Sequence, residues 1–302
     1  AFPGCSAAVG SSKGSYWQGG FGKYAKDDKT AKKLSLSTVS RPGGRTLYDL
    51  ASLTKVVGTT SVIIALVQKG KLSLDDKVAI RLPGFAPASL DKKILARRNR
   101  VTIRHLLLHT SGLPGWKPLY RTCKSYRKLL NAILPTALEA EPGSRYRYSD
   151  LGFILLGALV EDMSGMGLDQ YCWEKIYRPL GMQATGFINL EVIGQKKVEA
   201  ATEMIAPTER CRWRKRVLCG EVHDDNAYAM GGVAGHAGLF APIDDVDRLV
   251  TCLVECHADA HTFLPGDILR EFWTVDEPVP DSTWACGWDT PSSHGSSAGK
   301  LF

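Results

Sequence analysis

Apolar residues gather in two long runs that are bounded by polar turns. Residues 56–67 form the longest run, and we predict a buried helix there that opens near Ser52. Residues 151–163 form the second run, which begins after Asp150 and ends at Ser164-Gly165, a typical end of a helix. Both runs are too short, and too often interrupted by polar residues, to predict a transmembrane span.

Shorter patterns surround these two predicted helices. Two short strands are predicted at residues 5–9 and 15–21. A Gly/Ser-rich turn separates them, which predicts a β-hairpin. Residues 23–45 are polar and rich in lysine, so we predict a loop. Residues 120–138 read as a basic helix. Residues 231–240 contain too many glycines for a regular element, which indicates backbone packed close to a neighbour.

A third helix is predicted from Thr102, a plausible N-cap, to Gly112, with Pro114 just beyond it. His105 and His109 lie one turn apart in this segment, a spacing that fits a metal pair or a general base. No carboxylate or third ligand stands at a matching spacing. We therefore expect both histidines to pack and to form hydrogen bonds.

Ser52 and Lys55 form an S-x-x-K pair at the start of the first predicted helix. Backbone N–H groups at a helix start are unpaired and favour negative charge. Residues three apart share a face, so the amine lies near the hydroxyl. If burial keeps part of the amine neutral, it can take the hydroxyl proton, and the Ser52 N–H can stabilise the oxyanion formed by attack on a carbonyl.

The S-x-x-K pattern alone is weak evidence for a nucleophile, because it occurs three more times in this chain. Only Ser52 opens a long apolar segment, and we expect surface serines near solvated lysines at the other three. These three pairs are Ser89/Lys92, Ser125/Lys128 and Ser297/Lys300.

Composition narrows the class of protein only slightly. A chain of 302 residues, 44% of them hydrophobic, can bury a large core and exceeds a minimal binding module. The net charge of +7 is spread along the chain, except for the basic cluster at residues 211–216. That cluster could contact an anionic polymer, but a solvated loop is the better interpretation. We predict no nucleic-acid interface.

Eight cysteines are scattered without a C-x-x-C pair, so neither a zinc ribbon nor a redox dithiol is indicated. A helix is predicted from Asp244 through Val254. Near its end, spacings of four could place two thiols and two histidines on one helix face as a metal cluster. Separate buried thiols are the better interpretation, and we expect no metal site. The four residues are Cys252, Cys256, His257 and His261.

Four stretches together resemble the serine β-lactamase-like hydrolases. This family includes class C β-lactamases, D-alanyl-D-alanine carboxypeptidases of the penicillin-binding type and related carboxylesterases. The stretches occur in the family's order and extend over nearly the whole chain, which makes them far more specific than one S-x-x-K pair. They are Tyr48-Asp49-Leu50-Ala51-Ser52-Leu53-Thr54-Lys55, residues 102–114, Tyr148-Ser149-Asp150-Leu151-Gly152-Phe153, and residues 231–240.

The resemblance implies an α+β fold in which helices flank an antiparallel sheet and a mostly helical region is inserted. We expect one catalytic domain over residues 1–302, with the sheet built from about 1–70 and 235–302 and the insertion at about 71–234. It further implies a small-molecule or peptidoglycan-peptide substrate, no metal or organic cofactor, and a place in the periplasm or cell envelope.

The resemblance also implies roles for individual residues. Ser52 is expected to be the nucleophile, with its backbone N–H as half of the oxyanion hole. Lys55 is expected to share the role of base with Tyr148. Asp150 is expected to contact substrate. Many relatives carry Asn where this chain has Asp150, and an ionised Asp can only accept hydrogen bonds. This change disfavours β-lactams and favours a protonated Lys55, which moves the role of base toward Tyr148.

The third family motif, K/H-T/S-G, is not found after residue 240. His236-Ala237-Gly238 comes nearest, but it belongs to the glycine-rich stretch and we do not assign it. We expect that the chain stops short of this motif and of the last strands, and that it is processed or partial, since it begins with Ala1 and shows no signal peptide. A protein that ended at Phe302 is expected to turn over weakly and to leave a sheet edge open.

Three functions follow, in order of preference. The first is hydrolysis of an ester or a D-alanyl-type amide through an acyl-enzyme. The second is hydrolysis of β-lactam rings. The third, from a different class, is non-catalytic binding of cell-wall peptide.

Overall fold

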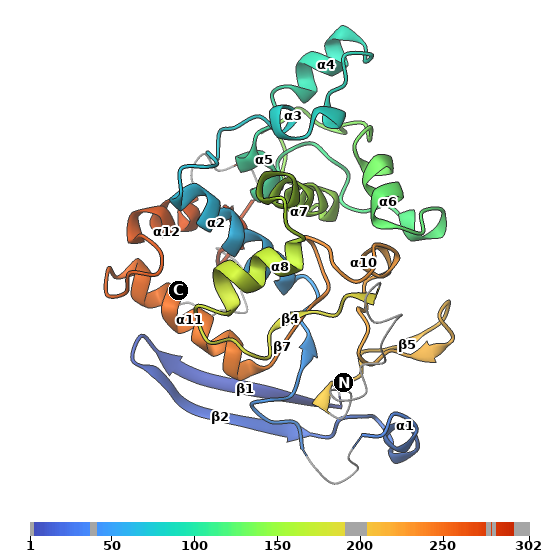
Figure 1. Ribbon diagram of the computed structural model, residues 1–302, viewed down its shortest axis with the longest axis vertical. Coiled ribbons are helices and arrows are strands. Elements are labelled where there is room, and N and C mark those ends of the chain that lie inside the picture. Colours follow the sequence, from blue (N-terminus) through green and yellow to red (C-terminus); the bar gives the residue numbers. More distant parts are fainter. Residues whose placement is uncertain (1–2, 37–40, 191–203, 276–278, 280–281, 293–302) are drawn as a thin grey trace.

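The computed structural model describes residues 3–36, 41–190, 204–275, 279 and 282–292. It shows the predicted α+β class, with small antiparallel sheets among helices (Figure 1). A long hairpin, β1–β2, forms one side of the molecule. Helix α11 lies next to it, and α12, α2, α7 and α8 lie beyond α11.

The described helical segments range from a single turn to about four turns. They are α1 Asp28–Lys33, η1 Lys55–Thr60, α2 Ser61–Gln68, α3 Val78–Arg81, η2 Pro83–Phe85, α4 Lys92–Arg98, α5 Ile103–Leu107, η3 Leu119–Arg121, α6 Tyr126–Ile133, α7 Asp150–Ser164, α8 Leu168–Cys172, η4 Trp173–Tyr177, α10 Asp225–Ala229, α11 Ile243–His257 and α12 Gly266–Trp273.

The strands are short except for the first two. They are β1 Gly4–Ser11, β2 Gly14–Gly22, β3 Tyr48–Asp49, β4 Gly186–Phe187, β5 Arg210–Cys211, β6 Arg216–Val217, β7 Leu239–Ala241, β8 Trp284–Ala285 and β9 Trp288–Asp289.

The N-terminal hairpin confirms the strand prediction. Strands β1 and β2 pair antiparallel, with Gly4 opposite Gly22 and Val9 opposite Trp17, and the register shifts after Val9. Helix α11 contacts both strands, so the hairpin has one face covered by a helix.

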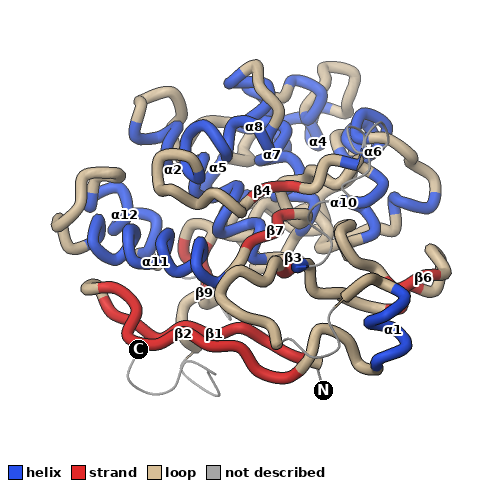
Figure 2. The backbone as a smooth tube through the Cα atoms, turned by 60° about the horizontal axis from the view of Figure 1, so that its bottom comes forward, coloured by secondary structure: helices blue, strands red, loops and turns tan. Residues whose placement is uncertain are grey.

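A three-stranded sheet at the centre of the molecule joins distant parts of the chain (Figure 2). Its order is β3–β7–β4, all antiparallel, with Tyr48 opposite Ala241 and Gly186 opposite Phe240. The strand that ends just before Ser52 is thereby fixed to the glycine-rich stretch. Strand β4 lies within the range 71–234, and the division into sheet and insertion remains a prediction.

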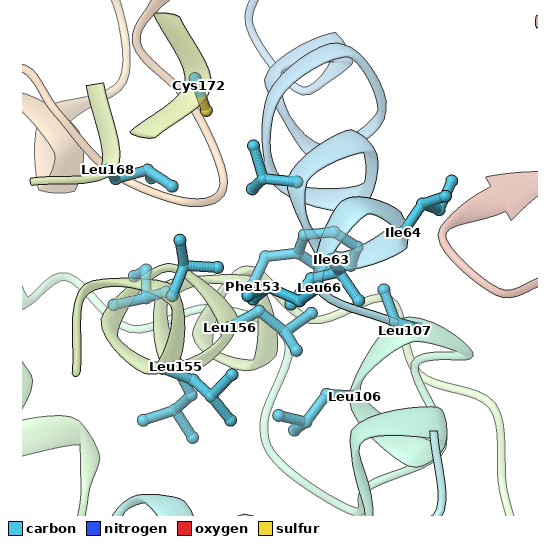
Figure 3. Packing of buried hydrophobic residues seen from close by; sticks show 14 of the residues in the cluster. Ile63, Ile64, Leu66, Leu106, Leu107, Phe153, Leu155, Leu156, Leu168 and Cys172 are labelled. Atoms are coloured by element: carbon cyan, nitrogen blue, oxygen red, sulfur yellow. The ribbon is translucent and has the colours of Figure 1, made fainter. Parts of the chain in front are cut away.

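The core forms where α2, α5 and α7 meet (Figure 3). Ile63 and Leu66 of α2 face Phe153 and Leu156 of α7, with Leu106 of α5 beside them, and all five side chains are buried. Each such side chain contributes about 1.5–3 kcal/mol on burial. These contacts explain why both long apolar runs form helices.

The first predicted helix differs from expectation at its start. Leu53 and Thr54 are helical, residues 55–60 continue as the π-helix η1, and α2 follows from Ser61. Ser52 lies in the turn directly before Leu53, at the start of the helical segment instead of inside it. π-Helical turns are rare and concentrate at functional sites.

The other helix predictions are confirmed in part. Helix α7 ends, as predicted, at Gly165 with a φ of 68°. Thr102 caps α5 as predicted, but α5 ends at Leu107 because His109 adopts a φ of 57°. The region 120–138 contains only the short η3 and α6, separated by turns.

Within the described residues, no single helix is both long and apolar enough to cross a membrane. The pair Asp150–Ser164 and Leu168–Tyr177 meets that test only when combined, and it is bent by 77°.

Candidate active site

Ser52 lies in an exposed turn whose backbone is held in an unusual conformation. Ala51 has a φ of 47°, a left-handed value that costs free energy for a residue with a Cβ. The Asp49 carboxylate fixes this turn, since it accepts N–H groups from Ala51 at 2.8 Å and His223 at 2.6 Å. Burial raises the pKa of Asp49, and these two hydrogen bonds oppose the rise.

The Ser52 N–H is available for a ligand. Leu53, Thr54 and Lys55 donate their N–H groups to carbonyls of residues 50–52. Among the described residues, none accepts a hydrogen bond from the Ser52 N–H. The turn therefore presents a hydroxyl and an unused amide donor on the same exposed residue.

Lys55 is buried beneath Ser52, with a side chain only 1% exposed. Three oxygens from three parts of the chain surround its Nζ. Nζ donates to Ser52 Oγ at 3.0 Å and to the His236 carbonyl at 3.1 Å, and it lies 2.7 Å from Asp150 Oδ1. An ammonium group has three donors and no acceptor, so this surrounding suits the charged form.

Asp150 is the counter-ion of Lys55. Its carboxylate is 17% exposed and stands at the first residue of α7, where the helix dipole favours negative charge. The Asp150 N–H donates to the Gly115 carbonyl at 2.8 Å, which fixes the start of the helix. The structure thus brings the predicted substrate-contacting residue directly onto the predicted base.

Tyr148 meets Lys55 through the face of its ring. The distance from Lys55 Nζ to the ring centroid is 4.8 Å, a cation–π geometry. The ring also lies 5.5 Å from that of Trp284. Within the described chain the Tyr148 hydroxyl forms no hydrogen bond to Ser52 or Lys55. All three predicted catalytic residues therefore meet, but the tyrosine touches the lysine with its ring.

His109 holds the loop that carries Tyr148. Its Nδ1 accepts the Ser149 N–H at 3.0 Å, and its carbonyl accepts the Arg147 N–H at 2.9 Å. Its ring lies 4.5 Å from that of Tyr148. Burial, together with the charge of Lys55, lowers the pKa of His109 to about 3, so the ring is neutral at physiological pH. The predicted packing role is confirmed, while its support of Tyr148 was not foreseen.

The glycine-rich stretch packs close to a neighbour, as predicted, and that neighbour is α7. A Cβ on Gly235 would lie 2.1 Å from the Phe153 carbonyl, so only glycine fits there. The Gly235 carbonyl accepts the Thr59 hydroxyl at 2.7 Å. This contact brings the next carbonyl, that of His236, onto Lys55. Sequence reasoning missed this carbonyl because the contact depends on backbone and not on residue type.

A second acidic group stands behind Lys55. Asp224 Oδ1 lies 2.9 Å from His236 Nε2. Burial alone would raise the pKa of Asp224, but His236, the Ala227 N–H and the charge of Lys55 together lower it below its usual range. Asp224 therefore remains ionised and adds negative charge near the lysine.

The other S-x-x-K pairs lie in different surroundings. Ser125 caps α6, because its hydroxyl accepts the Lys128 N–H at 3.4 Å. Ser89 lies in an exposed turn. Ser297 and Lys300 lie outside the described residues.

The basic cluster at residues 211–216 forms a turn between β5 and β6 that is mostly exposed, as predicted, except that Cys211 and Arg214 are buried. Arg214 is buried and contacts Glu221 at 3.5 Å and Asp225 at 2.9 Å. Arg216 pairs with Glu221 at 2.7 Å. These acidic partners follow shortly in sequence, and they neutralise the arginines locally.

This chain is similar to several known proteins. The family model described as Beta-lactamase matches residues 1–292. An Escherichia coli protein named D-alanyl-D-alanine carboxypeptidase is 36% identical over 259 residues, 80% of this chain and 58% of that protein. A Bacillus subtilis protein named N-acetylmuramyl-L-alanine amidase is 33% identical over 257 residues, 81% of this chain and 58% of that protein. The chain thus spans somewhat more than half the length of both relatives.

Solved structures show the same fold. The octameric penicillin-binding protein homologue from Pyrococcus abyssi superposes with a TM-score of 0.68 at 21% identity, over 94% of this chain and 60% of that one. The family match, the two relatives and the shared fold lead to one conclusion: the chain belongs to the β-lactamase family of serine hydrolases.

Proposed function

We propose that this protein hydrolyses an ester or a D-alanyl-type amide through an acyl-enzyme on Ser52. One observation carries the proposal: an exposed serine hydroxyl accepts a hydrogen bond from a buried lysine that is itself fixed by Asp150 and the His236 carbonyl. A solvated lysine would sample many positions, whereas this one is held against the nucleophile.

The proposed first step joins Ser52 Oγ to the substrate's carbonyl carbon. The hydroxyl proton leaves through Lys55 or Tyr148, and the Ser52 N–H stabilises the oxyanion. The oxyanion then collapses, and the leaving alcohol or amine departs with a proton. In the second step water attacks the acyl-enzyme, which releases the acid and restores the hydroxyl.

The surroundings of Lys55 favour separate roles for Lys55 and Tyr148. Asp150 at 2.7 Å stabilises the ammonium, which cannot accept a proton. In the resting enzyme Lys55 is then the cationic partner, and Tyr148, whose ring faces that charge at 4.8 Å, relays the proton: its hydroxyl oxygen takes the Ser52 proton while its own proton passes to the leaving group. This role requires the Tyr148 hydroxyl to form a hydrogen bond with Ser52 when substrate binds.

Hydrolysis of β-lactams is the second candidate. The family model supports it, but Asp150 argues against it, because a carboxylate cannot donate to the amide carbonyl of an acylamino side chain. We propose simple esters as the preferred substrates and D-alanyl peptides as the next, the latter in line with the name of the Escherichia coli relative.

The test uses the full-length protein with a penicillin and, separately, with a short-chain p-nitrophenyl ester. Intact mass and turnover are measured beside a Ser52→Ala control. Ester turnover without reaction with penicillin supports the proposed hydrolase. A stable Ser52-dependent penicillin adduct indicates a penicillin-binding peptidase, and rapid penicillin hydrolysis indicates a β-lactamase. Absence of both turnover and adduct with the two substrates favours the non-catalytic, peptide-binding alternative.

Asp150→Asn tests the substrate preference. The amide can donate one hydrogen bond that the carboxylate cannot, so we expect penicillin acylation to rise relative to ester turnover by about 3- to 10-fold. Both rates are measured on the same preparation. An unchanged ratio would show that Asp150 does not select the substrate.

A further inference from the structure

Two cysteines and a histidine converge at the end of α11, away from the residues proposed for catalysis. Cys252 and Cys256 lie one turn apart on this helix, and His261 lies in the turn that leads to α12. The two Sγ atoms are 3.9 Å apart. His261 Nδ1 lies 3.9 Å from Cys252 Sγ and 3.8 Å from Cys256 Sγ. All three potential ligand atoms lie within 4.8 Å of one another.

These distances match one face of a tetrahedral metal site. With Zn–S bonds of about 2.3 Å and Zn–N bonds of about 2.05 Å, tetrahedral angles put two sulfurs about 3.8 Å apart and a sulfur and a nitrogen about 3.6 Å apart. The observed triangle needs to contract by only a few tenths of an ångström. Both cysteines are free thiols, and their sulfurs are too far apart for a disulfide.

The neighbouring backbone suits a charged sulfur. The Leu264 N–H points at Cys256 Sγ at 3.4 Å, the kind of second contact that stabilises a metal-bound thiolate. The Phe263 N–H donates to His261 Nδ1 at 3.0 Å. A metal would take the lone pair that this amide now uses, so metal binding replaces one weak hydrogen bond.

The cluster is buried on one side and open on the other. Cys256 is fully buried, Cys252 is nearly so, and His261 is exposed. Cys252 and His261, together with Glu255, line a surface hollow that reaches Gly14 of the hairpin. The hollow gives an ion a way in and leaves room for a fourth ligand.

We propose that Cys252, Cys256 and His261 bind a soft divalent cation of the zinc type, with the fourth position open to the hollow. Sulfur and imidazole ligands at tetrahedral spacing select Zn²⁺ over Mg²⁺ or Ca²⁺, which prefer oxygen. Binding releases the two thiol protons and leaves the imidazole neutral. The ion ties the end of α11 to the start of α12, which packs against α2.

The site departs from the arrangement that the sequence suggested. Helix α11 ends at His257, and the ring of that histidine stacks on Trp273 at 5.0 Å, outside the cluster. His261 joins the thiols because the chain turns back after the helix. Equal spacing on one helix face therefore included the two clustered thiols but also His257, which lies outside the cluster.

The test titrates the reduced, chelator-treated protein with Co²⁺ alone and records absorption. We expect one equivalent to bind, with a thiolate-to-cobalt charge-transfer band and the visible bands of a tetrahedral ion, and Zn²⁺ to displace it. His261→Gln changes an exposed side chain, so it should fold normally, and we expect affinity to fall by at least about tenfold. Cys252→Ser should also remove the charge-transfer intensity of one sulfur.

Cys219→Ser is the matched control, because this half-buried thiol lies outside the cluster. It should bind Co²⁺ like the wild type. A second readout is thermal unfolding, where Zn²⁺ should raise the midpoint of the wild type and of Cys219→Ser more than that of His261→Gln at the same concentration. Absence of the charge-transfer band in the reduced wild type, or equal binding by His261→Gln and Cys219→Ser, would overturn the proposal.

Discussion

Lys55 and Arg98 are both buried cations with about 1% exposure, yet their surroundings differ. Arg98 donates to the carbonyls of Phe85, Leu134 and Thr136. Lys55 touches one backbone carbonyl, a carboxylate and an exposed hydroxyl. A buried cation that contacts only backbone carbonyls holds the chain together, whereas one that contacts a hydroxyl open to solvent can act on a ligand.

Of the changes proposed here, replacing Lys55 should have the largest effect, and the effect should be on turnover. Lys55→Met keeps an apolar stem of similar length but removes the cation beside Ser52. We expect turnover per folded molecule to fall by about 100- to 10,000-fold, the range for loss of an acid–base group. Ester hydrolysis, corrected for the folded fraction by circular dichroism, measures the effect. Near-normal turnover would remove Lys55 from the mechanism.

Arg98→Met should lower stability and leave turnover per folded molecule unchanged, the reverse of the effect of Lys55→Met. It leaves three buried carbonyls without a donor and removes the stacking of the guanidinium on Phe85, whose ring centroid lies 4.4 Å away. Burial lowers the pKa of Arg98. We expect the free energy of unfolding to fall by about 3–5 kcal/mol, with unchanged turnover per folded molecule. Urea unfolding followed by fluorescence checks it.

His109 makes the stability of the protein depend on pH. Its pKa in the folded protein is about 3, below the ordinary value of 6.5. Between these two pH values the unfolded chain binds a proton at this histidine and the folded chain does not. Stability is therefore full above pH 6.5 and declines as the pH falls toward 3, with a slope of about 1.4 kcal/mol per pH unit.

His109→Gln removes this titration while keeping an oxygen that can accept the Ser149 N–H. We expect a flatter loss of stability between pH 6.5 and pH 4 than in the wild type, measured by urea unfolding at several pH values. Identical slopes in the two proteins would mean that His109 is not held neutral by burial.

Much of this arrangement could be predicted from the sequence. The apolar runs, the Thr102 cap and the glycine at the end of α7 follow from local chemistry, and they formed as expected. The S-x-x-K pair and its neighbours pointed to residues that do meet. Local patterns succeed where the cause lies within a few residues.

Other features depend on contacts between distant segments. The His236 carbonyl reaches Lys55 because Gly235 lets the backbone approach α7, and backbone contacts leave no trace in residue type. Arg214 is buried because Glu221 and Asp225 fold back onto it, although its neighbours in sequence are basic. The contact between the Tyr148 ring and Lys55 likewise depends on a distant residue, because His109 holds the loop that carries Tyr148.

The most direct test of the central claim is covalent labelling of the nucleophile. The full-length protein is treated with a fluorophosphonate, which phosphonylates activated serines, and its intact mass is measured. Ser125→Ala serves as the control, since Ser125 belongs to an S-x-x-K pair but only caps α6. We predict a single adduct on the wild type and on Ser125→Ala, and none on Ser52→Ala. An adduct that persists in Ser52→Ala would contradict the account.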